Sequence, residues 1–366
     1  MKKKIAIIGA GNAGCLTAIH FYYHGRDLFD IELYHDPSAP IERVGQGATL
    51  GVVKKISTIF NLNFADRNYI NATRKEGIVY ENWGKKSEKI YHSFPLPNVA
   101  FHYSPDLLSK LVLESGLFNV ITKSISDPES EIDSDYIFDC RGRHDRDINN
   151  YDQLVSPLNS AILSRKSENS DNAFTRTVAT PNGWTFAIPN HDSVSYGYLY
   201  NDTITSKADA EKDFTERFDV IPDGQLKFDN YIAKKCFVGE RTFLNGNRLS
   251  FIEPMEATST HFYLDLCKYA WDYIVNDSPL ELINLGIREE AHKIEKYILW
   301  HYQFGSKYDT MFWQHAKSLP FEEDHEFSDS LNYAKTHTYC DTIKCEGYDY
   351  SQWGPYSFKN WIDNVI

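Results

Sequence analysis

The sequence predicts an α/β protein with a Rossmann-like, dinucleotide-binding lobe and a mostly helical C-terminal lobe. Three observations support this prediction: an apolar N-terminal strand that runs into a glycine turn, two strand–glycine junctions far downstream, and helical hydrophobic spacing after about residue 260. A chain of 366 residues, of which 42% are hydrophobic, is long enough for two closely joined lobes. We expect a discontinuous cofactor lobe at 1–262, including an inserted sheet, and a helical lobe at 263–366.

The cofactor lobe begins with an apolar segment, residues 4–8, that predicts a buried parallel strand. The glycine turn at 9–14 follows, then a helical segment and a second strand at 30–34, which is the context that a GxGxxG motif requires. The first glycine permits the turn, the second lets the backbone approach a pyrophosphate, and the third lets helix and strand pack closely. Phosphates would lie at the helix N-terminus. The predicted cofactor-binding residues of this motif are Gly9, Gly11, Asn12, Ala13 and Gly14.

Further cofactor contacts are expected where other strands end. The acidic residue for the ribose is displaced by one position, because His35 ends the second strand and Asp36 follows it. Two later apolar segments run into glycines, at Gly142 and at Gly239. The repeated return of the chain to the cofactor favours FAD over NAD, which the glycine motif alone does not distinguish.

Composition and charge exclude several classes of function. The net charge of −13 repels phosphate backbones and anionic lipids, so neither a nucleic-acid partner nor a membrane partner is expected. The six cysteines form no CxxC pair and no cluster at zinc spacing, which predicts reduced thiols and no metal site. The N-terminal apolar segment is too short for a signal peptide or a membrane span, so we expect a cytoplasmic protein.

Several segments resemble the flavin-dependent, tryptophan-type halogenases, in the family's order and near its spacing. They resemble GxGxAG, the GVGEAT flavin loop, the segment ending in the catalytic lysine, WxWxIP, GYxY, FxEPLESTG and HY…DTPFW. In this chain the segments are 9–14, 44–49, 71–75, 183–189, 196–200, 251–259 and 301–313. The chain departs from the family at Gln46, which stands near the usual Glu, at Phe186 in place of Trp, and at Ala257 in place of Ser.

The resemblance implies the fold of the aromatic hydroxylase and halogenase flavoproteins, and a two-component halogenase. A separate flavin reductase would transiently supply FAD as FADH2. O2 would form a flavin hydroperoxide that a halide ion attacks, giving hypohalous acid. Lys75 would deliver this electrophile and Glu256 would orient it and act as general base. The backbone N–H groups of Thr258 and Ser259 would bind the halide, and the flavin loop would add Gly47, Ala48 and Thr49.

The expected substrate is an electron-rich aromatic molecule such as an indole or a phenol. The resemblance assigns an aromatic substrate pocket to five residues: His92, Phe94, Trp184, Phe312 and Trp313. The glutamate that tryptophan halogenases use for the substrate ammonium group is missing, and the long insertion usual between the positions of Phe94 and Phe101 is absent. A short, more open member that is not restricted to free tryptophan is therefore expected.

Two alternatives remain at this stage. The first is a flavin-dependent aromatic hydroxylase, or monooxygenase, in which the activated oxygen attacks the ring directly. The second is a flavin-binding homologue without turnover. The sequence also leaves open whether the protein forms a homo-oligomer.

Overall fold

The computed structural model describes residues 2–41, 44–48, 50–62, 67–94, 99–143, 146–170, 172–337 and 347–365. The chain divides into two compact units. Unit 1 consists of Met1–Ala72, Tyr103–Leu154 and Asn230–Ala291, and unit 2 of Thr73–His102, Val155–Asp229 and His292–Ile366. Unit 1 is discontinuous, but the division does not follow the expected boundary after residue 262. The inserted sheet lies in unit 2 together with 292–366, whereas 263–291, expected in the helical lobe, lies in unit 1.

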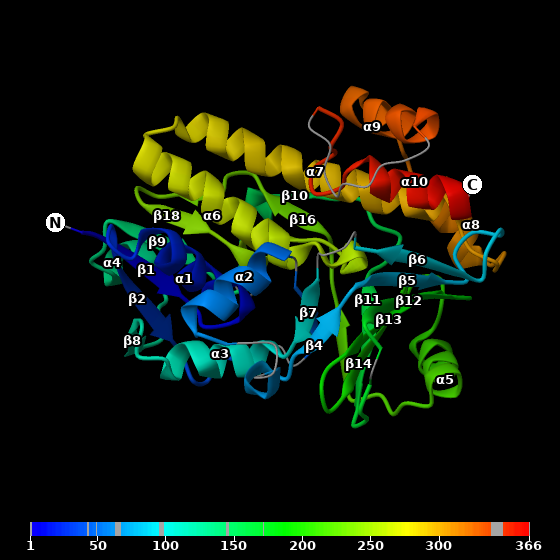
Figure 1. The fold of residues 1–366 in the computed structure, drawn as a ribbon, viewed down its shortest axis with the longest axis horizontal. Helices are drawn as coiled ribbons and strands as arrows, with labels where there is room; N and C mark the ends of the chain where they lie inside the picture. Colours follow the sequence, from blue (N-terminus) through cyan, green and yellow to red (C-terminus); the bar gives the residue numbers. More distant parts are fainter. Residues whose placement is uncertain are drawn as a thin grey trace. The chain divides into compact units, whose positions relative to one another are not determined.

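The centre of unit 1 is a six-stranded sheet with the strand order β17-β18-β9-β1-β2-β8 (Figure 1). Its strands are β1 (Lys3–Ile8), β2 (Phe29–His35), β8 (Asn119–Thr122), β9 (Tyr136–Asp139), β17 (Phe237–Val238) and β18 (Thr242–Leu244). All pairs are parallel except β17 with β18. The last four residues of β1 are buried, as expected for a strand in the middle of a parallel sheet. The predicted Rossmann-like order of strand, glycine turn, helix and strand is confirmed.

Helices of unit 1 follow the glycine turn and the segment that ends at Ser259. Its helices are α1 (Asn12–Gly25), α2 (Leu50–Ile59), α3 (Pro105–Glu114), α4 (Pro128–Glu131) and α6 (Ser259–Asn276), and it contains the first part of α7 (Leu280–Phe304). Its shorter strands are β3 (Gln46–Gly47), β10 (Tyr151–Gln153), β16 (Tyr231–Ala233) and β19 (Ser250–Phe251). Its 3-10 turns are η1 (Arg67–Ile70), η2 (Ile148–Asn150), η3 (Gly246–Arg248) and η4 (Met255–Ala257).

Two buried cysteines lie beside one polar pair in the interior of unit 1, and a third, Cys15, is buried nearby on α1 with its thiol 3.2 Å from the Ala10 carbonyl. Asn245 Nδ2 donates to Thr17 Oγ1 over 2.9 Å. The thiol of Cys267 lies 3.7 Å from the same hydroxyl, and that of Cys140 lies 3.9 Å from it. Burial raises the pKa of Cys15 and of Cys267 to about 12. These thiols are therefore protonated and poorly nucleophilic near neutral pH.

Unit 2 is built on a seven-stranded sheet with the order β15-β11-β14-β13-β12-β5-β6. Its strands are β5 (Gly77–Glu81), β6 (Lys89–Ser93), β11 (Ser160–Lys166), β12 (Phe174–Thr180), β13 (Gly183–Pro189), β14 (Val194–Tyr200) and β15 (Gly224–Lys227). All pairs are antiparallel except β12 with β5. Outside this sheet, β4 (Thr73–Lys75) pairs antiparallel with β7 (Ala100–Tyr103), of which the last residue, Tyr103, is assigned to unit 1. Its helices are α5 (Lys207–Phe218), the rest of α7, α8 (Met311–Ser318), α9 (His325–Thr336) and α10 (Pro355–Asn364).

The core of unit 2 is rich in tryptophan, and three of the indole N–H groups donate hydrogen bonds to named acceptors. Trp83 donates to the Thr177 carbonyl over 3.1 Å and Trp313 to the Thr180 carbonyl over 2.7 Å, both on β12. Trp184 donates to the Tyr302 hydroxyl over 2.8 Å. Because buried N–H groups are costly without an acceptor, these bonds fix the orientation of the rings. In the described part of the chain, no helix is long and apolar enough to cross a membrane.

Candidate functional site

The glycine turn of unit 1 shows why each of its three glycines is needed. Gly9 has φ +101°, and a Cβ there would lie 2.8 Å from the carbonyl oxygen of Cys140. A Cβ on Gly14 would lie 1.8 Å from the carbonyl oxygen of Gly9. A Cβ on Gly11, by contrast, would have no heavy atom of the described residues within 4 Å. Two glycines therefore allow close packing, and Gly11 faces the open space that a pyrophosphate needs.

Helix α1 starts directly at this open space, with Gly11 as its N-cap. Asn12 is held by the Tyr103 hydroxyl, which donates to its Oδ1 over 2.6 Å. Burial raises the pKa of Tyr103, so this phenol stays a hydrogen-bond donor. Ala13 lies in the first turn and is buried. The N–H groups and the positive dipole end of α1 complete a cradle that fits the pyrophosphate of FAD.

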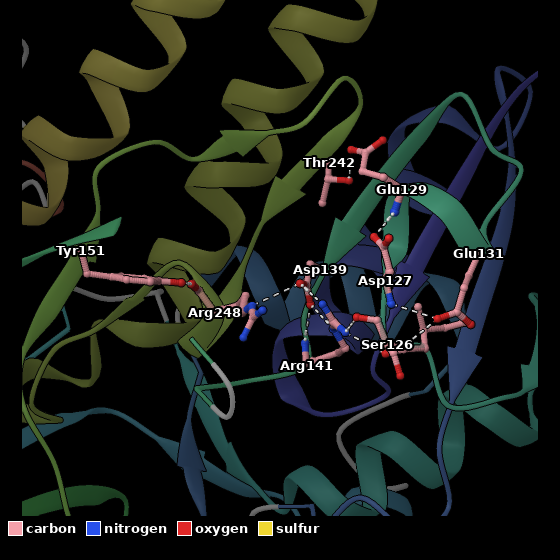
Figure 2. A network of polar contacts seen from close by, with 10 residues as sticks. Ser126, Asp127, Glu129, Glu131, Asp139, Arg141, Tyr151, Thr242 and Arg248 are labelled. Atoms are coloured by element: carbon pink, nitrogen blue, oxygen red, sulfur yellow. Dashed lines mark hydrogen bonds and ion pairs between the residues drawn. The ribbon is translucent and has the colours of Figure 1, made fainter. Parts of the chain in front are cut away.

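A buried ion-pair network stabilises the carboxyl end of β9, next to Gly142 (Figure 2). Asp139 accepts from Arg141 Nε over 2.9 Å and from a terminal nitrogen of the same guanidinium over 2.7 Å. Arg248 Nε lies 3.2 Å from Asp139 Oδ2. The Asp139 carboxylate raises the pKa of Arg141. This fork geometry fixes the backbone where Gly142, at φ +81°, turns away from the strand.

Neither Arg141 nor Arg248 is among the site residues predicted from the sequence. Arg141 also donates to the carbonyls of Ile125 and Ser126, over 2.7 and 2.9 Å. It therefore joins the end of β9 to the segment that follows β8. The sequence does contain one signal, which is an Asp–x–Arg pattern at the end of an apolar strand.

The structure corrects the third predicted junction. Gly239 lies in the turn between β17 and β18, before β18 begins. Because β18 runs parallel to β9, this turn is at the amino ends of the parallel strands, whereas dinucleotide sites lie at the carboxyl ends. Gly246 follows the carboxyl end of β18 with φ +63°, and a Cβ there would lie 2.5 Å from the Cβ of Ala13. Gly246, not Gly239, therefore packs against the start of α1.

Asp36 follows β2, where a ribose-binding carboxylate is expected. Its Oδ1 accepts from the backbone N–H of Ser38 over 2.9 Å and from the Ser38 hydroxyl over 2.7 Å. Hydrogen bonds from Ser38 and Ser124 hold the pKa of Asp36 below its ordinary value. The carboxylate is thus ionised and caps a turn, and its contact with a ribose stays a prediction. Thr49, predicted for the flavin loop, lies outside the described residues.

The segment before α6 has an unusual backbone. Glu256 has φ +66° and Ala257 has φ +55°, so two consecutive non-glycine residues adopt the left-handed conformation, which costs roughly 1–2 kcal/mol each. Such strain concentrates at functional sites. Thr258 then returns to helical angles as the N-cap of α6. A left-handed residue followed by a right-handed one aims successive N–H groups into a concave nest for an anion.

The predicted flavin loop lies beside this nest in unit 1. Thr260 Oγ1 donates to the carbonyl of Gly47 over 3.4 Å, and Ala48 is buried. The N–H groups of the first turn of a helix have no acceptor within the helix. Ser259, the first residue of α6, and Thr258 are thus placed as an anion-binding site requires. The structure brings the predicted halide residues and the flavin loop together.

Lys75 belongs to unit 2 and is almost completely buried, with 2% of its surface exposed. It ends β4, where it pairs with Ala100 of β7. Its Nζ lies 5.7 Å from the centroid of the Phe94 ring. A lysine is rarely this buried, so Lys75 is not an ordinary surface residue. Lys75 and Phe94, to which the resemblance assigns a catalytic and a substrate-binding role, are neighbours.

The other four predicted substrate residues are buried. Phe312 and Trp313 in α8 are 1% and 0% exposed, and Trp184 in β13 is 1% exposed. A ligand reaches such rings only if neighbouring side chains move, so their contact with substrate stays a prediction. His92 in β6 lies 5.8 Å from the Tyr356 ring and is also buried. Phe94 alone among these five is partly exposed. No cluster of three potential metal-ligating His, Cys, Asp or Glu side chains occurs within the described residues.

Comparison with known proteins identifies the family of this chain. The family model described as tryptophan halogenase matches residues 4–104 and 114–355. The chain belongs to the tryptophan halogenase family. Among curated relatives, tryptophan 7-halogenase RebH of Lentzea aerocolonigenes is 26% identical over 206 residues, which cover 51% of this chain and 39% of that protein. Tryptophan 6-halogenase ThaL of Streptomyces albogriseolus is 24% identical over 173 residues, which cover 45% and 32%. The matched part thus spans about a third of these relatives' length.

Solved structures of halogenases share the fold over the whole chain. BrvH, a flavin-dependent halogenase from Brevundimonas sp. BAL3, superposes with a TM-score of 0.82 at 17% identity, covering 100% of this chain and 90% of that one. The tryptophan 6-halogenase SttH from Streptomyces toxytricini gives a TM-score of 0.81 at 16% identity, covering 100% and 90%. These likenesses confirm the α/β fold of the halogenase flavoproteins that the motifs predicted.

Proposed function

We propose that this member of the tryptophan halogenase family is an FADH2-dependent halogenase acting on electron-rich aromatic molecules. The observation that carries the proposal is Lys75, a buried primary amine beside the Phe94 ring, which ends the segment that resembles the family's catalytic-lysine segment. A hydroxylase of the same fold needs neither this amine nor a halide nest. The family membership and the backbone strain at Glu256 and Ala257 support the same activity.

Unit 1 would hold the cofactor and the halide. Gly9, Gly11 and Gly14 shape the cradle at the start of α1, and Gly246 packs against it. Bound reduced flavin supplies the two-electron activation of O2 by which a halide ion becomes hypohalous acid. The N–H groups of Thr258 and Ser259 would bind the halide as neutral donors. Neutral donors suit this task because a buried cation would hold the anion too tightly for it to react.

Lys75 and Glu256 would act on the electrophile and on the ring. The Lys75 amine binds hypohalous acid through a hydrogen bond, or forms a transient haloamine with loss of water. The ring carbon then forms a bond to the halogen while the bond between halogen and oxygen, or halogen and nitrogen, breaks. Glu256 takes the proton from that carbon as general base. The net change is replacement of a ring C–H by C–X, with hypohalous acid consumed and water formed.

The proposed substrate is an indole, a phenol or a similar ring, not restricted to free tryptophan. The missing clamp glutamate and the short connection from Phe94 to Phe101 support this breadth. A separate reductase would supply reduced flavin. A ring between aromatic side chains would be held by dispersion and offset stacking.

The test combines photoreduced FAD, O2, bromide and a panel of indoles and phenols, with mass spectrometry of the products. We expect a brominated product from the unchanged protein. Lys75→Ala should lower its yield by about 10²–10⁴-fold, the usual contribution of a positioned catalytic group, while flavin oxidation continues. Lys89→Ala, which changes an exposed lysine of β6, is the matched control and should keep the yield. Hydroxylated products that do not depend on halide, or no product across the panel, would contradict the proposal.

A further inference from the structure

A second buried titratable group, His102, lies on the same strand pair as Lys75. In the register of β4 with β7, His102 is opposite Thr73 and Ala100 is opposite Lys75. Side chains two residues apart on a strand point to the same face, so Thr73, Lys75 and His102 share one face. The imidazole is 0% exposed. The chemistry proposed above gives this histidine no role.

Both ring nitrogens of His102 have hydroxyl partners. Nδ1 lies 3.1 Å from Thr73 Oγ1, and Nε2 lies 2.8 Å from Thr175 Oγ1. The Thr73 hydroxyl donates to the carbonyl oxygen of Pro189 over 2.6 Å. A continuous chain of hydrogen bonds therefore runs from Thr175 through His102 and Thr73 to Pro189.

The positions of the protons in this chain follow from counting donors. A carbonyl can only accept, so the single proton of the Thr73 hydroxyl is used on Pro189. Thr73 can then only accept from the imidazole, which places a proton on Nδ1 of His102. Burial and the nearby charge of Lys75 hold the pKa of His102 well below its ordinary value. The ring is therefore neutral, and its Nε2 accepts from the Thr175 hydroxyl.

The chain of hydrogen bonds attaches the strand of Lys75 to the large sheet of unit 2. Thr175 lies in β12, and Pro189 ends β13 as the last residue of the segment that resembles WxWxIP. The backbone next to Lys75 is held as well, because Glu76 N–H donates to the Ala173 carbonyl over 2.7 Å and Phe94 N–H donates to the Glu76 carbonyl over 2.6 Å. The place of the Lys75 amine thus depends on contacts on both sides of β4.

We propose that His102 is a positioning residue for Lys75, which acts as the neutral, Nδ1-protonated imidazole and fixes β4 through Thr73. This inference rests on the proposed halogenase function, because Lys75 must deliver the electrophile for its position to matter. A 1 Å displacement of a catalytic group costs up to about 10²-fold in rate. Protonation of His102 would also place a second positive charge beside Lys75 in a buried environment.

The activity test compares variants by the yield of halogenated product per reduced flavin consumed. His102→Phe removes both hydrogen bonds and should lower kcat for halogenation by about 10–10²-fold, with little change in KM for the aromatic substrate. Flavin oxidation should continue, and hypohalous acid trapped in solution by an added 1,3-diketone should rise. His102→Asn keeps an amide N–H toward Thr73 and should restore part of the yield.

Thr175→Val tests the other end of the chain of hydrogen bonds with little change in volume. We expect a smaller loss of halogenated product per reduced flavin consumed than in His102→Phe. The matched control is Thr177→Val, since Thr177 is also buried and lies two residues further along β12. This variant should give the same yield of halogenated product per reduced flavin as the unchanged protein. A folded His102→Phe protein with unchanged yield would overturn the inference. If His102→Phe does not fold, an unchanged yield in Thr175→Val would overturn it.

A measurement that does not depend on activity uses 15N-labelled histidine. The imidazole shifts of His102, assigned by their loss in His102→Asn, should show a neutral ring protonated at Nδ1 at pH 7. A doubly protonated ring, or a proton on Nε2, would overturn the inference. Absence of any halogenated product from the unchanged protein would instead contradict the proposed function, and the 15N result would still report the state of the ring.

Discussion

The glycine turn of unit 1 and the tryptophans of unit 2 were both assigned functional roles from sequence, and their surroundings differ. At the turn, a Cβ on Gly11 would have no heavy atom of the described residues within 4 Å. In unit 2, Trp313 is fully buried and its indole donates to the Thr180 carbonyl. The first region presents backbone to a ligand, and the second fills a core. Residue type alone does not separate these cases, because an aromatic ring packs as well in a core as against a substrate.

The largest effect expected from this comparison is on stability. Trp313→Ala should destabilise the protein by about 3–5 kcal/mol, the usual cost of deleting a buried tryptophan. Phe94→Ala removes a partly exposed ring and should cost much less stability but raise KM for the aromatic substrate. Chemical denaturation and steady-state kinetics on both variants measure this contrast. A Trp313→Ala protein with native stability and a raised KM would assign Trp313 to the substrate site after all.

Within the glycine turn, Gly14 and Gly11 should respond differently to alanine. Gly14→Ala forces its Cβ against the Gly9 carbonyl and should cost about 1–3 kcal/mol or more, as overpacking does. Gly11→Ala has room for its Cβ and should keep the stability of the protein while weakening FAD binding. Thermal melts and FAD titration separate the two outcomes. Equal loss of stability in both variants would contradict the assignment of Gly11 to the pyrophosphate.

Acidification should destabilise both units through one buried histidine in each. Burial lowers the pKa of His20 in unit 1 and of His102 in unit 2 well below 6.5. Below about pH 6.5 the unfolded chain then binds more protons than the folded one. The free energy of unfolding therefore decreases as the pH is lowered. Each histidine contributes at most about 1.4 kcal/mol per pH unit. Denaturation between pH 7.5 and 5 should show a smaller pH slope in His102→Asn, and an unchanged slope would contradict a neutral His102.

The smallest expected difference concerns the two candidate junctions at Gly239 and Gly246. Both have φ +63°, so alanine should cost either site about 1–2 kcal/mol of stability. The added Cβ of Gly239→Ala meets the Glu129 side chain, whereas that of Gly246→Ala meets Ala13 at the start of α1. Only Gly246→Ala should therefore weaken FAD binding, by about tenfold or less. Equilibrium FAD titration decides between them. Weaker binding in Gly239→Ala alone would reverse the correction.

The parts of the site that the sequence predicted well depend on local backbone geometry. Gly9, Gly11 and Gly14 follow a strand and open a helix within six residues, so their steric roles can be inferred without knowing the rest of the fold. Gly239 was misplaced because sequence does not reveal which of two adjacent short strands, β17 or β18, runs parallel to β9.

Contacts between segments that are distant in the sequence could not be predicted either, because they depend on strand register and on which helix face packs. The pairing of Thr73 with His102 depends on the register of β4 with β7, and a slip of one residue would turn His102 to the other face. The burial of Trp313 depends on which face of α8 meets the sheet of unit 2. Sequence periodicity suggests an amphipathic helix but does not name its partner.

The buried cysteines of unit 1 have a consequence for a protein that we propose generates a strong oxidant. Hypohalous acid attacks thiolates rapidly, and oxidation of cysteine beyond the sulfenic acid is largely irreversible. With a pKa of about 12, Cys15 and Cys267 carry a thiolate only about once in 10⁵ molecules at pH 7. The burial that raises the pKa of these two thiols would therefore also slow their oxidation by the product of the proposed reaction.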